Sequence, residues 1–303
     1  MLAIRVNEND NFMKPVILIK KEKAELLTNS SLMLIKGEVG SGKSRLAMNL
    51  MKGLLLGKED LNLEYIVCPE NKHVIYLSTE MSKYHLQRRL LKVLEGVPEK
   101  DRNKLVFLDL CTLSTEDKFK ALQEAVKAYP PYVIVIDQLA DFVSNINDIE
   151  QADSIIKKLM NGVEKTDCAI VGILHQNEDS GINAKARGHL GSILEQKVVS
   201  SIGITDTSKG FKIKTTKLRE GSHLEIIAKF NESTEMLIES NSSLQSDVTS
   251  LTYPINRDDL IKEVMKIENC SSRTAITRID SLCENNTLAK TKEGKNVVYN
   301  LNN

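Results

Sequence analysis

Residues 32–44 read Leu-Met-Leu-Ile-Lys-Gly-Glu-Val-Gly-Ser-Gly-Lys-Ser, an apolar run that passes directly into a glycine-rich loop. The four apolar residues at its start predict a buried β-strand. Residues 45–56, which follow the loop, place apolar side chains at helical spacing and predict a helix. A strand, a glycine-rich turn and a helix in this order predict one unit of a parallel sheet covered by helices.

Short apolar runs and helical patterns continue to alternate up to about residue 197. The expected strands lie at residues 16–19, 32–35, 74–77, 105–110, 132–136 and 169–174, and the expected helices at residues 45–56, 82–94, 116–128 and 149–164. The strands are mostly uninterrupted apolar runs, which is typical of strands buried on both faces. The sequence therefore predicts an α/β domain with a doubly wound, mostly parallel sheet.

After residue 197 the pattern changes to closely spaced strands with glycine-containing turns. These strands are expected at residues 198–204, 211–217, 224–230 and 234–238. A meander of this kind predicts antiparallel strands at the edge of the sheet.

A polar segment separates the C-terminal part of the sequence from the rest. Residues 241–253 are rich in Ser, Asn and Thr and predict a linker between a domain of residues 1–240 and a small domain of residues 254–303. Two helical patterns and a hairpin follow, at residues 257–267, 272–284 and 288–301. Helix, helix and hairpin in this order are typical of a winged helix-turn-helix domain.

The composition is that of an ordinary globular protein. Lys plus Arg and Asp plus Glu both number 41, so the whole-chain charge gives no indication of nucleic acid or membrane binding, which would have to come from local patches. The five cysteines are scattered and form no Cys-x-x-Cys pair, and no apolar run approaches the length of about 20 residues that spans a bilayer. We therefore expect a cytoplasmic protein with reduced thiols.

The pattern Gly-x-x-x-x-Gly-Lys-Ser at residues 37–44 fits a phosphate-binding loop. Its glycines let backbone N–H groups surround phosphates without a clash, and the following helix adds the positive end of its dipole. Lys43 is expected to reach the β- and γ-phosphates, and the Ser44 hydroxyl to coordinate Mg²⁺. An ordinary glycine turn is the alternative. The expected cofactors are ATP and Mg²⁺, and the expected nucleotide-binding residues are Gly37, Glu38, Val39, Gly40, Ser41, Gly42, Lys43, Ser44 and Arg45.

Two carboxylates are expected at the same edge of the sheet as this loop, because each follows an apolar strand. Asp137 ends one of these strands and would hold Mg²⁺ together with Ser44. Gln138 rather than a second acid follows Asp137, so Glu80 is the candidate base for the attacking water. As the alternative, either carboxylate caps the helix that follows it.

Four further motifs follow the glycine-rich loop. They read Val-Ile-Tyr-Leu-Ser-Thr-Glu-Met at residues 74–81, Val-Ile-Asp-Gln-Leu-Ala-Asp-Phe at 135–142, Ala-Arg-Gly-His-Leu-Gly-Ser at 186–192 and Lys-Leu-Arg-Glu-Gly at 217–221. Together with the loop, and in this order, they resemble the RecA-like ATPases of the DnaB helicase group and the RepA-type hexameric helicases of plasmids. The resemblance covers about residues 15–230 and implies a RecA-like fold.

This resemblance implies that ATP is hydrolysed between the subunits of a ring, so the expected partners include further copies of the chain, in a hexamer. It implies Glu80 as the catalytic base, and Lys217 and Arg219 as cations that reach the γ-phosphate on the neighbouring subunit. RecA-like proteins place a sensor of the γ-phosphate where His175 and Gln176 end a strand here. The alternatives are a solvated edge-strand face for the two cations and a structural role for the histidine. The expected catalytic residues are Lys43, Glu80, His175, Gln176, Lys217 and Arg219.

DNA binding is expected at two places. Lys185 and Arg187 belong to a polar loop that would line the channel of a ring and grip single-stranded DNA, although Glu178 and Asp179 would oppose it. The small domain would contact duplex DNA through its second helix and its hairpin, with Arg273, Thr277, Arg278, Lys290, Lys292 and Lys295. A winged helix that binds protein is the alternative.

The sequence thus predicts an ATP-driven, DNA-associated motor or loader, similar to the RepA-type replicative helicases of plasmids or mobile elements. The second interpretation is an ATP-dependent regulatory switch, or an initiator of replication or mobilisation, that targets duplex DNA through its winged helix without unwinding it. The third is a DNA-binding adaptor that binds ATP only for structure.

Overall fold

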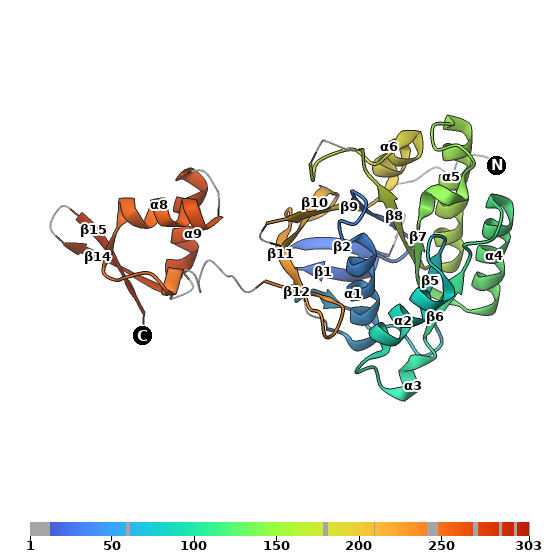
Figure 1. Cartoon of the computed structure of the whole chain (residues 1–303), viewed down its shortest axis with the longest axis horizontal. Coiled ribbons are helices and arrows are strands. Elements are labelled where there is room, and N and C mark those ends of the chain that lie inside the picture. Colours follow the sequence, from blue (N-terminus) through green and yellow to red (C-terminus); the bar gives the residue numbers. More distant parts are fainter. Residues whose placement is uncertain are drawn as a thin grey trace. The chain divides into compact units, whose positions relative to one another are not determined.

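The computed structural model shows two compact units, formed by residues Met1–Glu239 and Ser240–Asn303 (Figure 1). It describes residues 13–58, 61–177, 181–208, 210–240, 248–268, 272–284, 287–293 and 296–302 of the 303. The larger unit contains two hydrophobic clusters and the smaller unit contains one. Each unit therefore has a core of its own.

A nine-stranded sheet forms the centre of the larger unit. In spatial order its strands are β12 (Leu237–Glu239), β11 (Glu225–Phe230), β10 (Gly210–Leu218), β9 (Ser200–Thr207), β3 (Leu32–Gly37), β8 (Ala169–His175), β7 (Pro131–Asp137), β5 (His73–Ser78) and β6 (Leu105–Asp109). Neighbouring strands from β9 to β6 run parallel, whereas β10, β11 and β12 continue the sheet in antiparallel fashion. The expected meander is present, except that its first strand, β9, pairs in parallel with β3.

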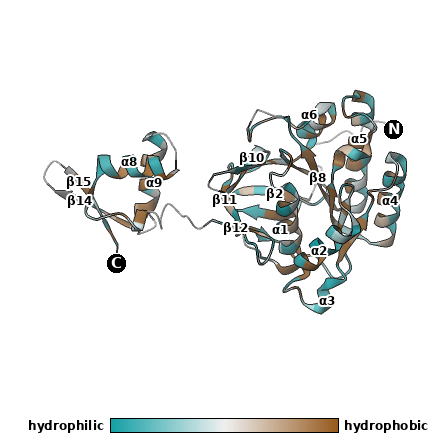
Figure 2. Ribbon diagram, in the orientation of Figure 1, coloured by the Kyte–Doolittle hydropathy of each residue, from teal (hydrophilic) through white to brown (hydrophobic). Residues whose placement is uncertain are grey.

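Helices cover both faces of this sheet (Figure 1). They are α1 (Lys43–Leu56), α2 (Lys83–Leu94), α3 (Glu99–Arg102), α4 (Thr115–Ala128), the 3-10 helix η1 (Leu139–Phe142), α5 (Ile149–Thr166) and α6 (Gly188–Lys197). Side chains of α1 and α2 join one hydrophobic cluster, and those of α4, α5 and α6 join the other. Figure 2 shows the consequence, with the central strand β8 largely brown and the outer helix α2 largely teal. The predicted α/β fold with a large, mostly parallel sheet is confirmed.

A small second sheet at the start of the larger unit was only partly predicted. Its strands, in the order β2-β1-β4, are β2 (Ala24–Thr28), β1 (Ile17–Lys21) and β4 (Glu64–Tyr65). The sequence predicted a strand near β1 but not the hairpin with β2, because β2 offers only the apolar pair Leu26-Leu27 between polar residues. Both leucines are nevertheless fully buried, so tertiary packing stabilises this short strand.

Helix α6 was not predicted, because its glycines make it a poor helix former. The structure gives a reason for Gly191. A Cβ at this position would lie 2.5 Å from the carbonyl carbon of Ala186, so only glycine lets α6 approach the preceding segment this closely. Leu190 and Leu194 then anchor the helix in the core.

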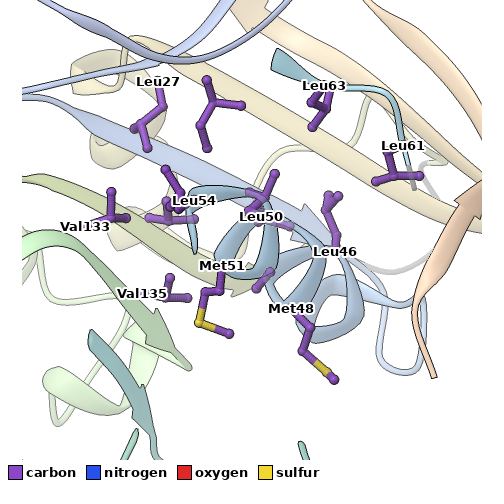
Figure 3. Packing of buried hydrophobic residues seen from close by; sticks show 14 of the residues in the cluster. Leu27, Leu46, Met48, Leu50, Met51, Leu54, Leu61, Leu63, Val133 and Val135 are labelled. Atoms are coloured by element: carbon purple, nitrogen blue, oxygen red, sulfur yellow. The ribbon is translucent and has the colours of Figure 1, made fainter. Parts of the chain in front are cut away.

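The helix that follows the glycine-rich loop packs one face against the sheet. Figure 3 shows Leu46, Leu50 and Leu54 along this face of α1, with Val133 and Val135 of β7 nearby. Full burial of each such leucine contributes about 1.5–3 kcal/mol to the stability of the fold. The start of α1, and with it the loop, is therefore fixed relative to the parallel strands.

The smaller unit consists of two helices and a three-stranded sheet with the order β13-β15-β14. Its elements are β13 (Ile255–Asn256), α8 (Arg257–Glu268), α9 (Ser272–Glu284), β14 (Leu288–Glu293) and β15 (Asn296–Leu301). The predicted helices and hairpin are present, and β13 is an additional strand. Of the predicted linker, residues 241–247 lie outside the described residues, while Val248 is buried in this unit and accepts a hydrogen bond from the Tyr253 hydroxyl.

In the described part of the chain, none of the helices is long and apolar enough to cross a bilayer.

Replacement of a core leucine on α1 tests this packing. Leu50 is 1% exposed, and Leu50→Ala should lower the free energy of unfolding of the larger unit by about 2–5 kcal/mol, because it removes buried methyl groups and leaves a cavity. Leu91 of α2 is 60% exposed, so Leu91→Ala is the matched control. This variant should change the free energy of unfolding by less than about 0.5 kcal/mol. Urea unfolding of the two variants gives both values. Equal effects would contradict the burial of this face.

Candidate active site

The sequence-predicted site residues of the larger unit meet at one edge of the sheet. Strands β3, β8, β7 and β5 run parallel, so their carboxyl ends lie at the same edge. Gly37 ends β3 and pairs with His175, which ends β8, while Asp137 ends β7 and pairs with Ser78 of β5. Glu80 follows β5 two residues later. The loop, both carboxylates and the histidine are therefore brought together by strand pairing alone.

The glycine-rich loop has the backbone that its pattern predicted. Gly42, the residue before α1, has a φ of 93°, in the left-handed region that favours glycine. No side chain caps the first turn of α1, so its N–H groups remain available to an anion. Gly37 is needed for space, because a Cβ would lie 2.3 Å from the carbonyl oxygen of Ile204. Ser41 Oγ is buried without a hydrogen-bond partner among the described residues. Because buried polar groups are normally hydrogen-bonded, this hydroxyl is suited to bind a ligand at the loop.

Lys43 lies in the mouth of this loop and is 6% exposed. Its ammonium group donates to the carbonyl oxygens of Gly37 at 3.0 Å and Glu38 at 2.6 Å, and it lies 3.1 Å from Nδ1 of His175. Burial lowers the pKa of Lys43, while the charges of Asp137, Glu80 and Glu38 act in the opposite direction. The loop carbonyl groups thus accept the hydrogen bonds of the Lys43 ammonium group, which the oxygens of a bound phosphate would accept in their place.

His175 connects Lys43 to Glu80. An ammonium group only donates hydrogen bonds, so His175 Nδ1 accepts from Lys43 and its ring proton lies on Nε2. That nitrogen is 3.6 Å from Oε1 of Glu80. The His175 ring is the main cause that lowers the pKa of Glu80, and partial burial of the carboxylate opposes this shift.

The two predicted carboxylates have different surroundings. The Glu80 side chain is 52% exposed, which gives water access to it, whereas the Asp137 side chain is 6% exposed. Neither occupies a helix-cap position, because the residue before α2 is Ser82 and the residue before η1 is Gln138. The capping alternative is therefore not what the structure has.

Asp137 has two partners that the sequence did not predict. The hydroxyl of Tyr76 donates to Asp137 Oδ2 at 2.5 Å, and Arg89 Nη1 lies 3.8 Å from the same oxygen. Burial, and next the charge of Asp137, raise the pKa of Tyr76 well above its ordinary value, so the phenol keeps the proton that it donates. A tyrosine in an otherwise apolar strand was a usable signal, since a buried hydroxyl needs a partner. No sequence signal pointed to Arg89, because its contact depends on how α2 packs.

Ser44 and Arg45, the last two predicted nucleotide-binding residues, lie at the start of α1. Ser44, its second residue, is half-buried. The Arg45 guanidinium lies 3.9 Å from the ring centre of Phe230, at one side of a cleft of about 660 Å³ that is also lined by Met81 and His85. This cleft lies beside the first turn of α1 and is lined by apolar, cationic and acidic side chains, the acidic ones being Glu232 and Glu235.

Lys217 and Arg219 lie elsewhere. Leu218 pairs with Ser200 at the start of β9, so both cations are near the amino ends of the parallel strands and away from the loop of their own chain. Lys217 Nζ donates to the carbonyl oxygens of Glu195 at 2.6 Å and Gln196 at 2.9 Å. Arg219 donates to Lys197 O at 3.1 Å. These bonds satisfy the last carbonyl groups of α6, which lack partners within the helix.

The loop with Lys185 and Arg187 folds back on the end of β8. Asn177 N donates to Lys185 O, and Arg187 N donates to His175 O. Gln176 is buried, and its side-chain nitrogen donates to Gly181 O at 3.1 Å. Lys185 and Arg187 themselves are exposed, whereas Glu178 and Asp179 lie outside the described residues. The loop backbone is thus tied directly to the strand that ends in His175.

The predicted DNA-binding residues of the smaller unit fall partly within the described structure. Arg273, Thr277 and Arg278 on α9 and Lys290 on β14 are exposed. The side chain of Lys292 and the whole of Lys295 lie outside the described residues.

A comparison with models of known protein families finds a match to this chain. A family model described as an AAA domain matches residues 19–181, a little more than half of the chain. This segment includes the glycine-rich loop, Glu80, Asp137 and His175, and it ends before Lys217 and Arg219. No match to a curated protein is found.

The contact between His175 and Glu80 can be tested through the pKa of Glu80. His175→Leu should raise the pKa of Glu80 toward its ordinary value of 4.5, because the variant removes the group that chiefly lowers it. Carbon-13 NMR titration of the glutamate carboxyl groups measures this change, and His189→Leu on the exposed start of α6 is the control. Because the folded-state pKa is lowered, ionised Glu80 stabilises the fold above its ordinary pKa, and that contribution is lost as the pH falls through the lowered value. An unchanged Glu80 titration in His175→Leu would show that another group is responsible.

Proposed function

The chain belongs to the AAA-domain family of P-loop ATPases, and on this premise we propose that it is a ring-forming, DNA-associated ATPase that hydrolyses ATP between its subunits. In this respect it would be similar to the RepA-type helicases or loaders of plasmids and mobile elements. The observation that carries the proposal is a division of the predicted catalytic residues. Lys43, Glu80 and Asp137 meet at one edge of the sheet, while Lys217 and Arg219 lie toward the other.

The residues at the loop fit a nucleoside triphosphate with Mg²⁺. Ser41 Oγ is buried without a partner among the described residues, and the start of α1 has uncapped N–H groups. The loop N–H groups and Lys43 would hold the phosphates, and Ser44 with Asp137 would hold the metal ion. When bound, Mg²⁺ supplies positive charge that neutralises the phosphate oxygens.

Glu80 is proposed to accept the proton of the attacking water. Its carboxylate is half-exposed, and its lowered pKa keeps it ionised at neutral pH. His175 orients it through Nε2 and contacts Lys43 through Nδ1. Since Lys43 exchanges the loop carbonyls for phosphate oxygens on binding, His175 senses whether the site is filled. This arrangement gives His175 the role of a positioning residue between Lys43 and the base.

Lys217 and Arg219 are proposed to complete the site of a neighbouring copy. Their distance from their own loop leaves a second chain as the place where they meet a γ-phosphate. Such an arginine commonly contributes a factor of about 10³–10⁵ to the rate of hydrolysis. In the single chain both cations bind the end of α6 instead, so they would have to leave these carbonyl groups when subunits associate.

DNA association is proposed from two exposed cationic regions. Lys185 and Arg187 are carried by a loop whose backbone is bonded to His175 and Asn177, so a strand held there would be coupled to the nucleotide site. On the smaller unit, Arg273 and Lys290 are exposed on α9 and β14 and would suit the phosphates of a duplex. The second region supports the alternative function, a switch that targets duplex DNA without unwinding it.

Mixing two inactive variants tests the shared site. Glu80→Gln should retain ATP binding but lose hydrolysis by a factor of about 10²–10⁴, since it removes the base. Arg219→Ala should lose a factor of about 10³–10⁵. A mixture of the two should regain activity in an ATPase assay, because some contacts then combine an intact Glu80 with an intact Arg219.

Glu124→Gln, an exposed glutamate of α4, should match the parent and serves as the control for the first variant. No recovery in the mixture, with each variant still assembling with the other by mass measurement, would contradict hydrolysis between subunits. Parent-level hydrolysis by Glu80→Gln would contradict the assignment of the base.

DNA dependence separates the motor from the switch. If the chain moves on a single strand, single-stranded DNA should stimulate its ATPase activity more than duplex DNA does. For single-stranded DNA, the logarithm of the binding constant falls linearly with the logarithm of the salt concentration. The variant Lys185→Ala/Arg187→Ala should make this slope shallower by about 0.7 for each lost phosphate contact. Lys100→Ala, in the exposed part of α3, is the control and should leave the slope unchanged. Stimulation by duplex alone would favour the switch.

A further inference from the structure

Tyr76 and Arg89 both bind the carboxylate that is expected to hold the metal ion. We propose that Tyr76 is a positioning residue that holds Asp137 in the orientation that receives Mg²⁺, and that Arg89 is a cation that competes with Mg²⁺ for Asp137. This inference deepens the proposed function and rests on it. It concerns how tightly the metal is held, which neither the loop motif nor the family match addresses.

Tyr76 is suited to orient another side chain because its own ring is fully buried and packed. It lies in the middle of β5 with none of its surface exposed. Its ring packs on Phe107 of β6, with ring centres 4.6 Å apart. The hydroxyl therefore has a fixed place, 2.5 Å from Asp137 Oδ2, and the carboxylate that accepts its hydrogen bond is fixed with it.

The choice of oxygen determines what Asp137 offers to a metal ion. A carboxylate has two oxygens, and the contacts of both Tyr76 and Arg89 fall on Oδ2. Oδ1 is then the oxygen that can accept from a metal-bound water. Hydrogen bonds to a metal-holding carboxylate orient it. Their loss typically weakens metal binding by a factor of about 10–100.

Arg89 supplies the charge that opposes the metal. Its guanidinium lies 3.8 Å from Asp137 Oδ2 and 3.4 Å from the Tyr76 hydroxyl, on a helix that begins just after Glu80. In the absence of metal it neutralises the buried carboxylate, which would otherwise lack a counter-ion at this oxygen. Because Mg²⁺ and Arg89 carry charges of the same sign, each weakens the hold of the other on Asp137. Without the Tyr76 hydroxyl, the carboxylate is free to turn toward Arg89.

The two residues therefore act in opposite directions. In the presence of a non-hydrolysable ATP analogue, Tyr76→Phe should weaken Mn²⁺ binding about tenfold, while Arg89→Gln should strengthen it by roughly the same factor. In the double variant the loss of the hydroxyl should weaken Mn²⁺ binding less than it does in the parent, because the competing cation is gone. Electron paramagnetic resonance measures free Mn²⁺ directly in all four proteins and does not depend on hydrolysis.

Matched controls separate this effect from general damage. Tyr84→Phe, on the exposed surface of α2, and Arg102→Gln, in α3, should leave Mn²⁺ affinity unchanged. Binding of the ATP analogue in EDTA should be the same in Tyr76→Phe and the parent, since the phosphate loop is untouched. If Tyr76→Phe fails to fold, Arg89→Gln alone remains decisive, because an unchanged or weaker Mn²⁺ affinity there overturns the competition.

The experiment also distinguishes this inference from the proposed function. A parent chain that binds no ATP analogue, with or without metal, would overturn the function itself. A parent that binds the analogue more tightly with metal, together with an unchanged Mn²⁺ affinity in Tyr76→Phe, would overturn only the role given to Tyr76.

Discussion

Parallel strand pairing is the constraint on which the rest of the larger unit depends. Hydrogen bonds between β3 and β8, β8 and β7, and β7 and β5 make these strands end together, so their last residues share one edge. The buried face of α1 then fixes the start of that helix against the same strands. A loop, a histidine and two carboxylates from distant parts of the sequence become neighbours without any further interaction being required.

Within this edge the charges form a connected arrangement. Lys43 is shared between loop carbonyls and His175, and His175 in turn faces Glu80. Asp137 is treated differently, because it is buried and bound by a tyrosine and an arginine. The half-exposed carboxylate is thus suited to meet water, and the buried one to hold a metal ion. Their separate environments give two chemically identical groups different proposed roles.

Lys217 and Arg219, which are proposed to act on a neighbouring copy, lie near the amino ends of the parallel strands. Lys217 and Arg219 are separated from their own loop by the reversal of β10 relative to β9. In the single chain they satisfy carbonyl groups at the end of α6. The same helix carries Glu195, whose carboxylate pairs at 2.5 Å with Lys36, the buried residue directly before the glycine-rich loop. Helix α6 therefore contacts both Lys36, directly before the glycine-rich loop, and the two cations Lys217 and Arg219.

The sequence by itself determined the features that depend on local chemistry: the alternation of strands and helices, the glycine-rich loop, and the positions of Glu80, Asp137 and His175 at strand ends. These features can be predicted from the apolar runs and the residues that follow them, because the carboxyl ends of parallel strands lie at a common edge of the sheet. Tertiary structure alone decided the rest. Helix α6 forms despite its glycines because Leu190 and Leu194 are buried in the core, and Gly191 leaves the room that Ala186 needs. Strand β2 forms because its leucines are buried. Tyr76 and Arg89 meet Asp137 only after β5, β7 and α2 have packed, since contacts between side chains far apart in sequence are set by packing and not by local pattern.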